Sequence, residues 1–186
     1  MALKLFAMKK DVITVHVVSD VACPWCYIGK RRLATALEQW KGKTVEVTWC
    51  PYQLDPNIPA SGLDGHTYLL RKFGDLERIH EMTERLKALG AIEGINFNFG
   101  DKWLAVNTLA LHQLLHVARD AGYGTLLKER FFKAYFEENL PLNNLEVLQG
   151  IMGEFGWEPS TTKKFLPIKL LPLPYNKKLP ITNNWG

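Results

Sequence analysis

The sequence predicts an α/β protein in which one β-α-β unit is followed by a long helical region. Residues 12–19 read VITVHVVS, and such a short, β-branched and almost uninterrupted run is typical of a buried strand. Residues 44–50 alternate in the manner of a strand, which Pro51 ends. Between them, apolar residues from Tyr27 to Trp40 recur near helical spacing, and Gly42 follows as a stop signal. Residues 11 to 56 therefore predict one β-α-β unit.

After this unit, the apolar residues recur mainly at helical spacing. We expect four or five helices, over residues 64–73, 75–89, 107–121, 125–138 and 144–155, and an alternating extended piece at 95–99. Acidic or amide residues precede several of these segments and glycines follow them, as at helix ends. The predicted organisation is a β-α-β half over residues 11–60, a helical domain over residues 64–158, and a tail rich in proline and lysine over residues 160–186.

Composition narrows the class of protein. The chain has 186 residues, of which 47% are apolar and 23% charged, and this excludes disordered, collagen-like and disulfide-dense proteins. The last 27 residues hold five lysines and no acid, so the first 159 carry a net charge of −1, and we expect no nucleic-acid partner. No apolar run approaches the roughly 20 residues of a membrane span, and the first residues do not resemble a secretory signal. We therefore expect no membrane partner and a cytoplasmic location.

The most specific motif is Cys23-Pro-Trp-Cys26, at the junction of the first strand and the helix. Pro24 suits the first helical turn because it has no N–H to leave unpaired. Cys23 would then lie at the helix N-terminus, where free amides and the macrodipole favour a thiolate and lower its pKa. In that arrangement Cys23 attacks a disulfide, and Cys26 resolves the mixed disulfide that results. The motif and its context therefore predict a thioredoxin-like site for thiol-disulfide exchange.

Two alternatives for the cysteine pair are an inert reduced pair and half of a zinc site. Zinc needs four nitrogen or sulfur ligands, and only Cys50 and scattered histidines remain. We interpret Cys50 as a small buried hydrophobe, and the pair His112 and His116 as helix packing, since two histidines alone cannot complete a site. The sequence also has no glycine-rich phosphate loop and no dinucleotide fingerprint. We expect neither a metal nor a cofactor.

Several residues near the motif allow two interpretations. Asp20 could hold a water or raise the pKa of a thiol, although an aspartate at such a place more often caps a turn. We expect Pro24 and Trp25 to contact the substrate, while the alternative for Trp25 is packing against the helices. Residues 30–32, Lys-Arg-Arg, could favour the thiolate, but a solvated helix face is the more common role of such a run.

Four segments resemble the DsbA-like thioredoxin-fold oxidoreductases, specifically the FrnE type: residues 19–29, 107–116, 131–138 and 145–148. The resemblance extends from about residue 12 to residue 157, and CPWCY is its most specific part. It implies a thioredoxin fold with the helical domain inserted after the β-α-β half. It also implies activity on disulfides, with disulfide-containing proteins, small-molecule thiols or possibly glutathione as partners.

Two other functions remain open beside that of a disulfide oxidoreductase with Cys23 as nucleophile and Cys26 as resolving thiol. The kappa-class glutathione transferases and isomerases resemble this chain in layout, but they typically have serine where Cys23 stands. The presence of both cysteines therefore favours a disulfide oxidoreductase over a kappa-class transferase or isomerase. The third possibility is an inactive, truncated remnant of the oxidoreductase fold.

The tail departs from the family pattern. The resemblance implies a cis-proline loop, a β-hairpin and a closing helix after the insertion, which need on the order of 50 residues. Only 27 residues follow Pro159; they lack strand alternation, and their prolines stand where a hairpin would need donors. Pro180 is the nearest candidate for the loop. We expect the C-terminal hairpin half to be missing or replaced from about Lys163, which would leave the site without its cis-proline wall and impair activity.

Overall fold

The predicted β-α-β unit is confirmed in the computed structural model, which describes residues 11–166. Strand β1 (Val12–Ser19) leads into helix α1 (Pro24–Gln39), and strand β2 (Thr44–Pro51) follows. The two strands are parallel, with Val12 opposite Thr44 and Ser19 opposite Pro51. Both strands therefore end at the edge of the sheet where α1 begins, and this places the cysteine motif beside the loop that leaves β2.

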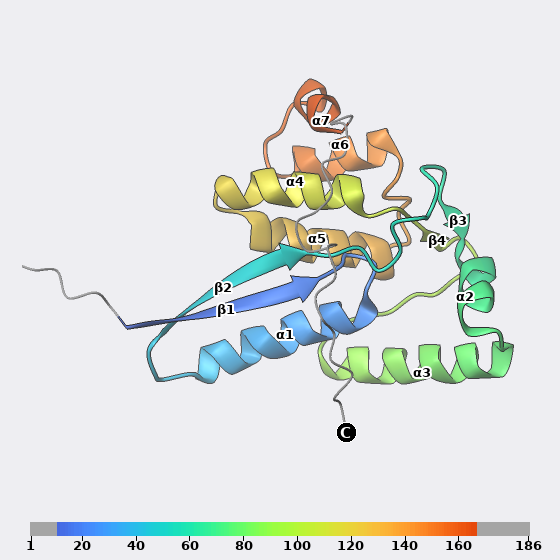
Figure 1. The fold of residues 1–186 in the computed structure, drawn as a ribbon, viewed down its shortest axis with the longest axis horizontal. Coiled ribbons are helices and arrows are strands. Elements are labelled where there is room, and N and C mark those ends of the chain that lie inside the picture. Colours follow the sequence, from blue (N-terminus) through green and yellow to red (C-terminus); the bar gives the residue numbers. More distant parts are fainter. Residues whose placement is uncertain (1–10, 167–186) are drawn as a thin grey trace, which may run out of the picture.

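Helices dominate the rest of the described chain, as predicted. The further elements are β3 (Leu63–Asp64), α2 (Gly65–Phe73), α3 (Leu76–Ile92), β4 (Leu104–Ala105), α4 (Leu109–Asp120), α5 (Gly124–Phe136), α6 (Leu145–Gly153) and α7 (Pro159–Phe165). In Figure 1, α1 lies on one side of the two long strands, and α4 and α5 lie on the other. The expected extended piece at residues 95–99 is not a strand. The antiparallel pair β3–β4 was not predicted, because two-residue strands are too short to show alternation.

Side-chain caps explain why several helices begin where they do. Asp64 accepts a hydrogen bond from the Thr67 amide at 2.8 Å, and Asp75 accepts one from the Glu77 amide at 2.8 Å. Each bond satisfies a backbone donor that has no partner within the helix. At the other end of α2, Gly74 adopts φ 76°, which a residue with a side chain rarely does.

An aromatic cluster between α1, α5 and the segment between α3 and β4 forms much of the core. Tyr27, at the first turn of α1, stacks on Phe132 of α5 with ring centroids 4.9 Å apart. Phe97 packs edge-on against Tyr27 at 6.0 Å and against Phe136 at 5.4 Å. The burial of these large rings attaches the first turn of α1 to the helical region.

The prediction that β1 is a buried strand is wrong for most of its length. Val12 and Ile13 are each 38% exposed and Val18 is 39% exposed, whereas Ser19 at the end of the strand is 1% exposed. Within the described residues β1 pairs with β2 alone. A β-branched run predicts a strand, but it cannot show how many neighbours will cover that strand.

The first residues of the tail form a short helix that the sequence analysis did not predict. Residues 159–165 form the short helix α7, with Pro159 in its first turn, and Phe165 packs against Trp157 with ring centroids 5.4 Å apart. A helix of seven residues is too short to show sustained periodicity. Residues 167–186, including Pro180, lie outside the described residues, and so does the prediction of a missing hairpin and cis-proline. The proposed division into domains also stays a prediction.

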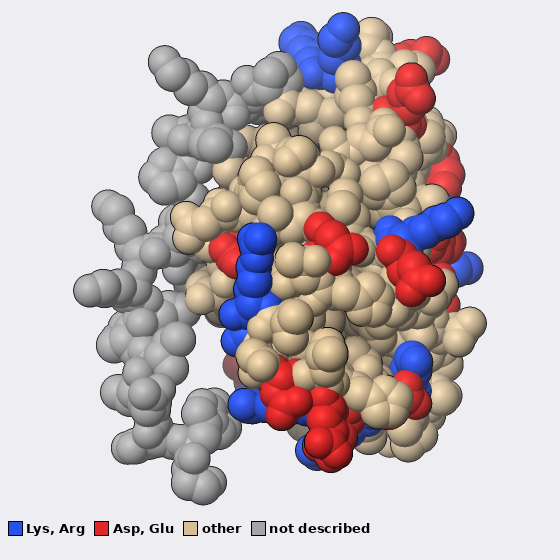
Figure 2. Space-filling model, turned by 90° about the vertical axis from the view of Figure 1, so that its right-hand side faces the viewer, with Lys and Arg blue, Asp and Glu red and all other residues tan. Residues whose placement is uncertain are grey.

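Charged side chains of both signs are interspersed on the face that Figure 2 shows, to which α2 and α3 contribute. On this face no large patch of one sign is seen. Between residues 11 and 166, no helix is both long enough and apolar enough to cross a membrane.

Gly65, beside β3 and β4, lies in a crowded position, and Gly150 in α6 offers an open position for comparison. A Cβ on Gly65 would lie 2.0 Å from the Trp103 ring and 2.6 Å from the Trp103 carbonyl oxygen, whereas a Cβ on Gly150 in α6 would meet nothing within 4 Å. We expect Gly65→Ala to lower the free energy of unfolding by about 1–3 kcal/mol through overpacking. Gly150→Ala should raise it by about 0.5–1 kcal/mol through helix propensity. Urea denaturation measures both, and equal effects would contradict the packing described.

Candidate active site

The cysteine motif lies at the start of α1, as predicted. Pro24 is in the first turn and Cys23 is the N-cap residue, with extended backbone. The amides of Cys26 and Tyr27 donate to the Cys23 carbonyl at 3.0 and 3.3 Å, so the helix begins at the first cysteine. Both thiols are free and half-buried, while Cys50 is buried in β2, as expected.

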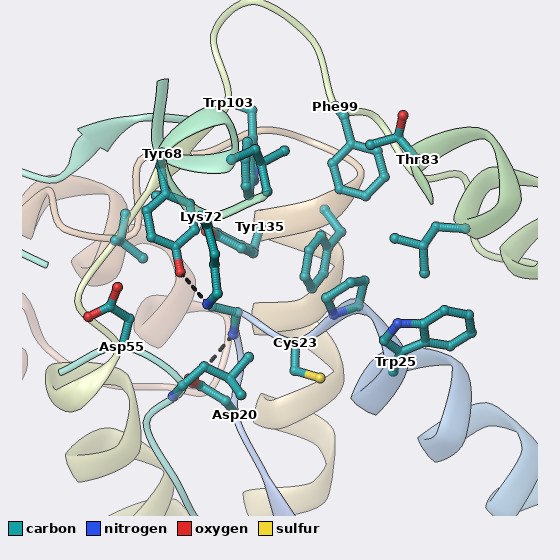
Figure 3. A pocket seen from close by; sticks show the side chains of 18 of the residues that line it. Asp20, Cys23, Trp25, Asp55, Tyr68, Lys72, Thr83, Phe99, Trp103 and Tyr135 are labelled. Atoms are coloured by element: carbon teal, nitrogen blue, oxygen red, sulfur yellow. Dashed lines mark hydrogen bonds between the residues drawn. The ribbon is translucent and has the colours of Figure 1, made fainter. Parts of the chain in front are cut away.

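The two thiols differ in what they face. Cys23 lines a cavity of about 300 Å³, and Cys26 packs against the core. Cys23 and Trp25 lie at one end of the cavity, and Phe99 and Trp103 lie at the other (Figure 3). Trp25 is 49% exposed, so packing against the helices does not bury it. A reagent in the cavity would therefore reach Cys23 before Cys26.

The cavity is mainly apolar and is built largely by the helical region. Its walls come from α2, α3 and α5 as well as from the start of α1. Pro24 also lines it, beside Cys23. The few polar groups include Lys72, whose ammonium donates to the Tyr68 hydroxyl at 2.9 Å (Figure 3). Its volume is at the lower end of the range for ligand-binding pockets.

A hydrogen bond between the two sulfurs couples their titration. Because the two sulfurs interact, loss of the first proton from the pair occurs at a lowered pKa and loss of the second at a raised pKa. Burial opposes both ionisations, while the Ser19 hydroxyl, a backbone bond at Asp20 and the Lys128 ammonium lower the pKa of Cys26 further. Because the two thiols titrate as a pair, the prediction that the helix N-terminus lowers the pKa of Cys23 stays a prediction. The Cys26 amide does lower the pKa of Cys23, but by less than the bond between the sulfurs raises it.

Asp20 anchors a buried network beneath the motif. The side chain is 2% exposed, and its Oδ2 accepts from the Leu54 amide at 2.7 Å. His112 Nε2 lies 3.2 Å from Asp20 Oδ1 and 2.8 Å from the Tyr52 carbonyl oxygen. Both neighbours are acceptors, so Nε2 carries a proton. Burial raises the pKa of Asp20, but the bonds to His112, Leu54 and Thr108 outweigh burial and leave it below its usual range.

The contacts of Asp20 and His112 bear on the interpretations of Asp20 and of the two histidines. Asp20 does accept from the Ala22 amide, at 3.4 Å, as a turn residue would. It also joins the end of β1 to the loop after β2 and to α4, a role that sequence reasoning did not predict. His112 is buried as expected, but His116 is exposed and contacts Arg119 instead. Among the residues that the structure describes, no three His, Cys, Asp or Glu side chains are grouped so that they could hold a metal ion.

The three basic residues after the motif connect α1 to other helices. Lys30 and Arg31 contact Glu129 of α5 at 2.5 and 2.6 Å, and Arg32 contacts Glu93 at the end of α3 at 2.7 Å. The Arg31 and Arg32 side chains are 39% and 53% exposed, so they lie on a solvated helix face as interpreted, whereas the Lys30 side chain is only 12% exposed.

Sequence reasoning missed Lys128 of α5. Lys128 is 2% exposed, and its Nζ lies 5.1 Å from the centre of the Trp49 ring and 5.2 Å from that of Phe132. Burial is the main cause that lowers its pKa, to about 8. A signal for this burial was present, since Lys128 lies in the apolar stripe that also contains Leu127 and Phe131.

The matched histidines of α4 test the buried network. His112→Ala leaves the buried Asp20 carboxylate without the Nε2–H donor, and we expect it to lower the free energy of unfolding at pH 7 by about 3 kcal/mol. His116→Ala changes an exposed side chain and should stay within about 0.5 kcal/mol of the wild type. Urea denaturation compares the two, and a similar cost for both would contradict the role of His112.

Asp20 also predicts a pH dependence of stability. A carboxyl group with a depressed pKa in the folded state contributes stability above its unfolded pKa of about 3.9, and this is lost as the pH falls through the folded value. We expect the urea concentration at the unfolding midpoint of the wild type to decrease as the pH is lowered below about 4. Asp20→Asn should be less stable at pH 7 but lose less on acidification. Parallel pH curves for the two proteins would refute this assignment.

Comparison with known proteins identifies relatives of this chain. A family model described as the DSBA-like thioredoxin domain matches residues 14–169. The uncharacterized protein YwbO of Bacillus subtilis (strain 168) is 30% identical over 156 residues, which are 83% of this chain and 72% of YwbO. The crystal structure of the probable DsbA oxidoreductase SCO1869 from Streptomyces coelicolor is similar, with a TM-score of 0.77 and 30% identity over 83% of this chain and 67% of that one.

A more distant neighbour shares the fold. The cytosolic disulfide reductase DsbM from Pseudomonas aeruginosa has a TM-score of 0.57 and 16% identity, covering 82% of this chain and 69% of DsbM. The fold class predicted from the sequence, α/β and thioredoxin-like, is confirmed by these matches.

Proposed function

The chain belongs to the DSBA-like thioredoxin domain family, and from that premise we propose that it is a thiol-disulfide oxidoreductase acting through Cys23 and Cys26. The observation that carries the proposal is the pair itself: a Cys23 thiol that lines an open cavity, with Cys26 beside it in the first turn of α1. Our proposal includes the FrnE subtype and a cytoplasmic location, which rest on the sequence resemblance.

The reaction begins from a reduced pair that holds one proton. Cys23 Sγ attacks a substrate disulfide from the cavity and passes its proton to the Cys26 thiolate, while one substrate sulfur leaves as a thiolate. That thiolate takes the proton of Cys26 through solvent. Cys26 then attacks Cys23 Sγ and releases the second substrate sulfur as a thiolate. The substrate disulfide gains two electrons, and the Cys23–Cys26 pair loses them.

The cavity defines what part of the substrate can bind. Its apolar walls accommodate an apolar group next to the disulfide, and Pro24 and Trp25 contact that group where it approaches Cys23. Disulfide-containing proteins and small-molecule thiols or disulfides, glutathione among them, have sulfur atoms that could reach Cys23 in this way.

One alternative is a glutathione-using transferase or isomerase, which the cavity beside Cys23 also suits. DsbM has been solved with GSH, and a 2-hydroxychromene-2-carboxylate isomerase shares the fold, at 17% and 13% identity. Such an activity needs no second thiol, so it would survive Cys26→Ser and require glutathione. A remnant without catalysis would fail to reduce insulin with dithiothreitol, in a turbidity assay in which an oxidoreductase succeeds.

Trapping tests the roles of the two cysteines. At pH 8, where Cys23 can ionise without Cys26 as its base, we expect Cys26→Ser treated with oxidised glutathione to accumulate a mixed disulfide at Cys23. Cys23→Ser should accumulate at least tenfold less adduct at Cys26, because that sulfur does not face the cavity. Mass spectrometry of peptides identifies the site.

The control for this trapping is Cys50→Ser in the Cys26→Ser background, which should trap as much glutathione as Cys26→Ser alone because Cys50 is buried. Preferential trapping at Cys26 would reverse the assigned roles. The absence of any adduct would contradict disulfide exchange at this site.

A further inference from the structure

The cavity beside Cys23 has a polar side that takes no part in the exchange reaction. Tyr68 and Lys72 stand four residues apart on α2, so both side chains leave the same face of that helix, and both line the cavity. The Lys72 ammonium donates to the Tyr68 hydroxyl at 2.9 Å and lies 5.2 Å from the centre of the same ring. In Figure 3 this pair lies on one side of Cys23, and Trp25 lies on the other.

Lys72 is the one cation among the described residues that line the cavity. None of the ion pairs within residues 11–166 includes it, and its hydrogen bond there is to a neutral hydroxyl. Within the same residues the Tyr68 hydroxyl accepts this bond and donates none. The pair therefore keeps N–H and O–H donors for a further acceptor. Lys72 is exposed and Tyr68 is half-buried, so an acceptor can reach both from solvent.

The two acidic residues that line the cavity have other partners. Asp20 is 2% exposed and is bound by His112. Asp55 accepts from the Asn57 amide at 3.1 Å and forms no ion pair with Lys72. Asp55 lies on the same side of the cavity as Lys72 and would weaken the binding of an anion there (Figure 3).

The rest of the cavity is mainly apolar and rich in aromatic rings. Its aromatic walls include Phe73, Phe99, Trp103, Tyr135 and Phe136. A long polar chain would lose its water along these walls without gaining hydrogen bonds, whereas an apolar body has none to lose. A volume of about 300 Å³ fits one small molecule. The cavity therefore combines an apolar interior with a single cationic anchor on one side of the nucleophile.

We propose that the cavity selects a small disulfide with an aromatic or aliphatic body and a carboxylate, and that Lys72 and Tyr68 bind this carboxylate. The inference rests on the proposed function. Cys23 Sγ bonds to the sulfur of the half held in the cavity, the substrate S–S bond breaks, and the other half leaves as a thiolate. Cys26 then attacks Cys23 Sγ and releases the held half as a thiolate. The substrate gains two electrons and the cysteine pair loses them.

Two disulfides that differ in one group test the proposal. 4,4′-Dithiodibenzoic acid has a carboxylate on each ring at pH 7, and its diamide has a neutral group of similar size. The absorbance of the released thiolate gives the rate constant with which the reduced protein reacts with each. We expect Lys72→Met to lower the ratio of the diacid rate to the diamide rate about tenfold, because a hydrogen bond to a charged group is lost. Lys72→Arg should keep the ratio within about twofold of the wild type.

Lys133→Met is the matched control, because Lys133 is an exposed lysine of α5 that does not line the cavity. It should leave the ratio unchanged, while Asp55→Asn removes an opposing charge and should raise it. An unchanged ratio in Lys72→Met would overturn the proposal, and so would an equal fall in Lys133→Met, since net charge alone would then explain it. Oxidised glutathione has carboxylates on a polar body. If Lys72→Met slowed its reduction as much as that of the diacid, the preference for an apolar body would be overturned.

Binding without reaction separates this inference from the proposed function and needs no variant that might not fold. 4-(Methylsulfanyl)benzoate has the ring, the sulfur and the carboxylate but no disulfide. Titration calorimetry should show that the wild type binds it about tenfold more tightly than the corresponding amide. Equal binding of the two would overturn the inference, however fast the exchange. Tighter binding of the acid that Lys72→Met abolishes, without any exchange at Cys23, would count against the proposed function alone.

Discussion

The stacking of Tyr27 on Phe132 is the contact on which the site depends. It lies between the first turn of α1 and α5, with ring centroids 4.9 Å apart and both rings fully buried. The ion pairs of Lys30 and Arg31 with Glu129 act across the same pair of helices. Because α1 begins at the cysteine motif, this packing fixes the two thiols against α5. A motif that is local in the sequence thereby receives its electrostatic environment from a helix about a hundred residues away.

Two buried charges flank the thiols and are satisfied in different ways. The Asp20 carboxylate accepts hydrogen bonds from His112 and the Leu54 amide, whatever the state of the cysteines. The Lys128 ammonium lies over the faces of the Trp49 and Phe132 rings. The first arrangement stabilises the fold around the motif. The second offsets part of the cost of burying an ammonium.

The cavity separates the roles of the two sulfurs. Cys23 faces an apolar space with walls from α2, α3 and α5, while Cys26 lies against the core with Ser19 and Lys128. A substrate therefore reaches Cys23 before Cys26.

The sequence by itself determined the β-α-β unit, the helices and the place of the motif, because strand alternation, helical periodicity, Asp64 and Asp75 as caps and Pro24 in a first turn are local signals. Only the tertiary structure decided that β1 is largely exposed, that Asp20 meets His112 and that Lys128 is buried against Trp49 and Phe132. These properties arise between residues far apart in the chain. Burial and charge depend on which surfaces meet, and periodicity within one segment does not specify its partner.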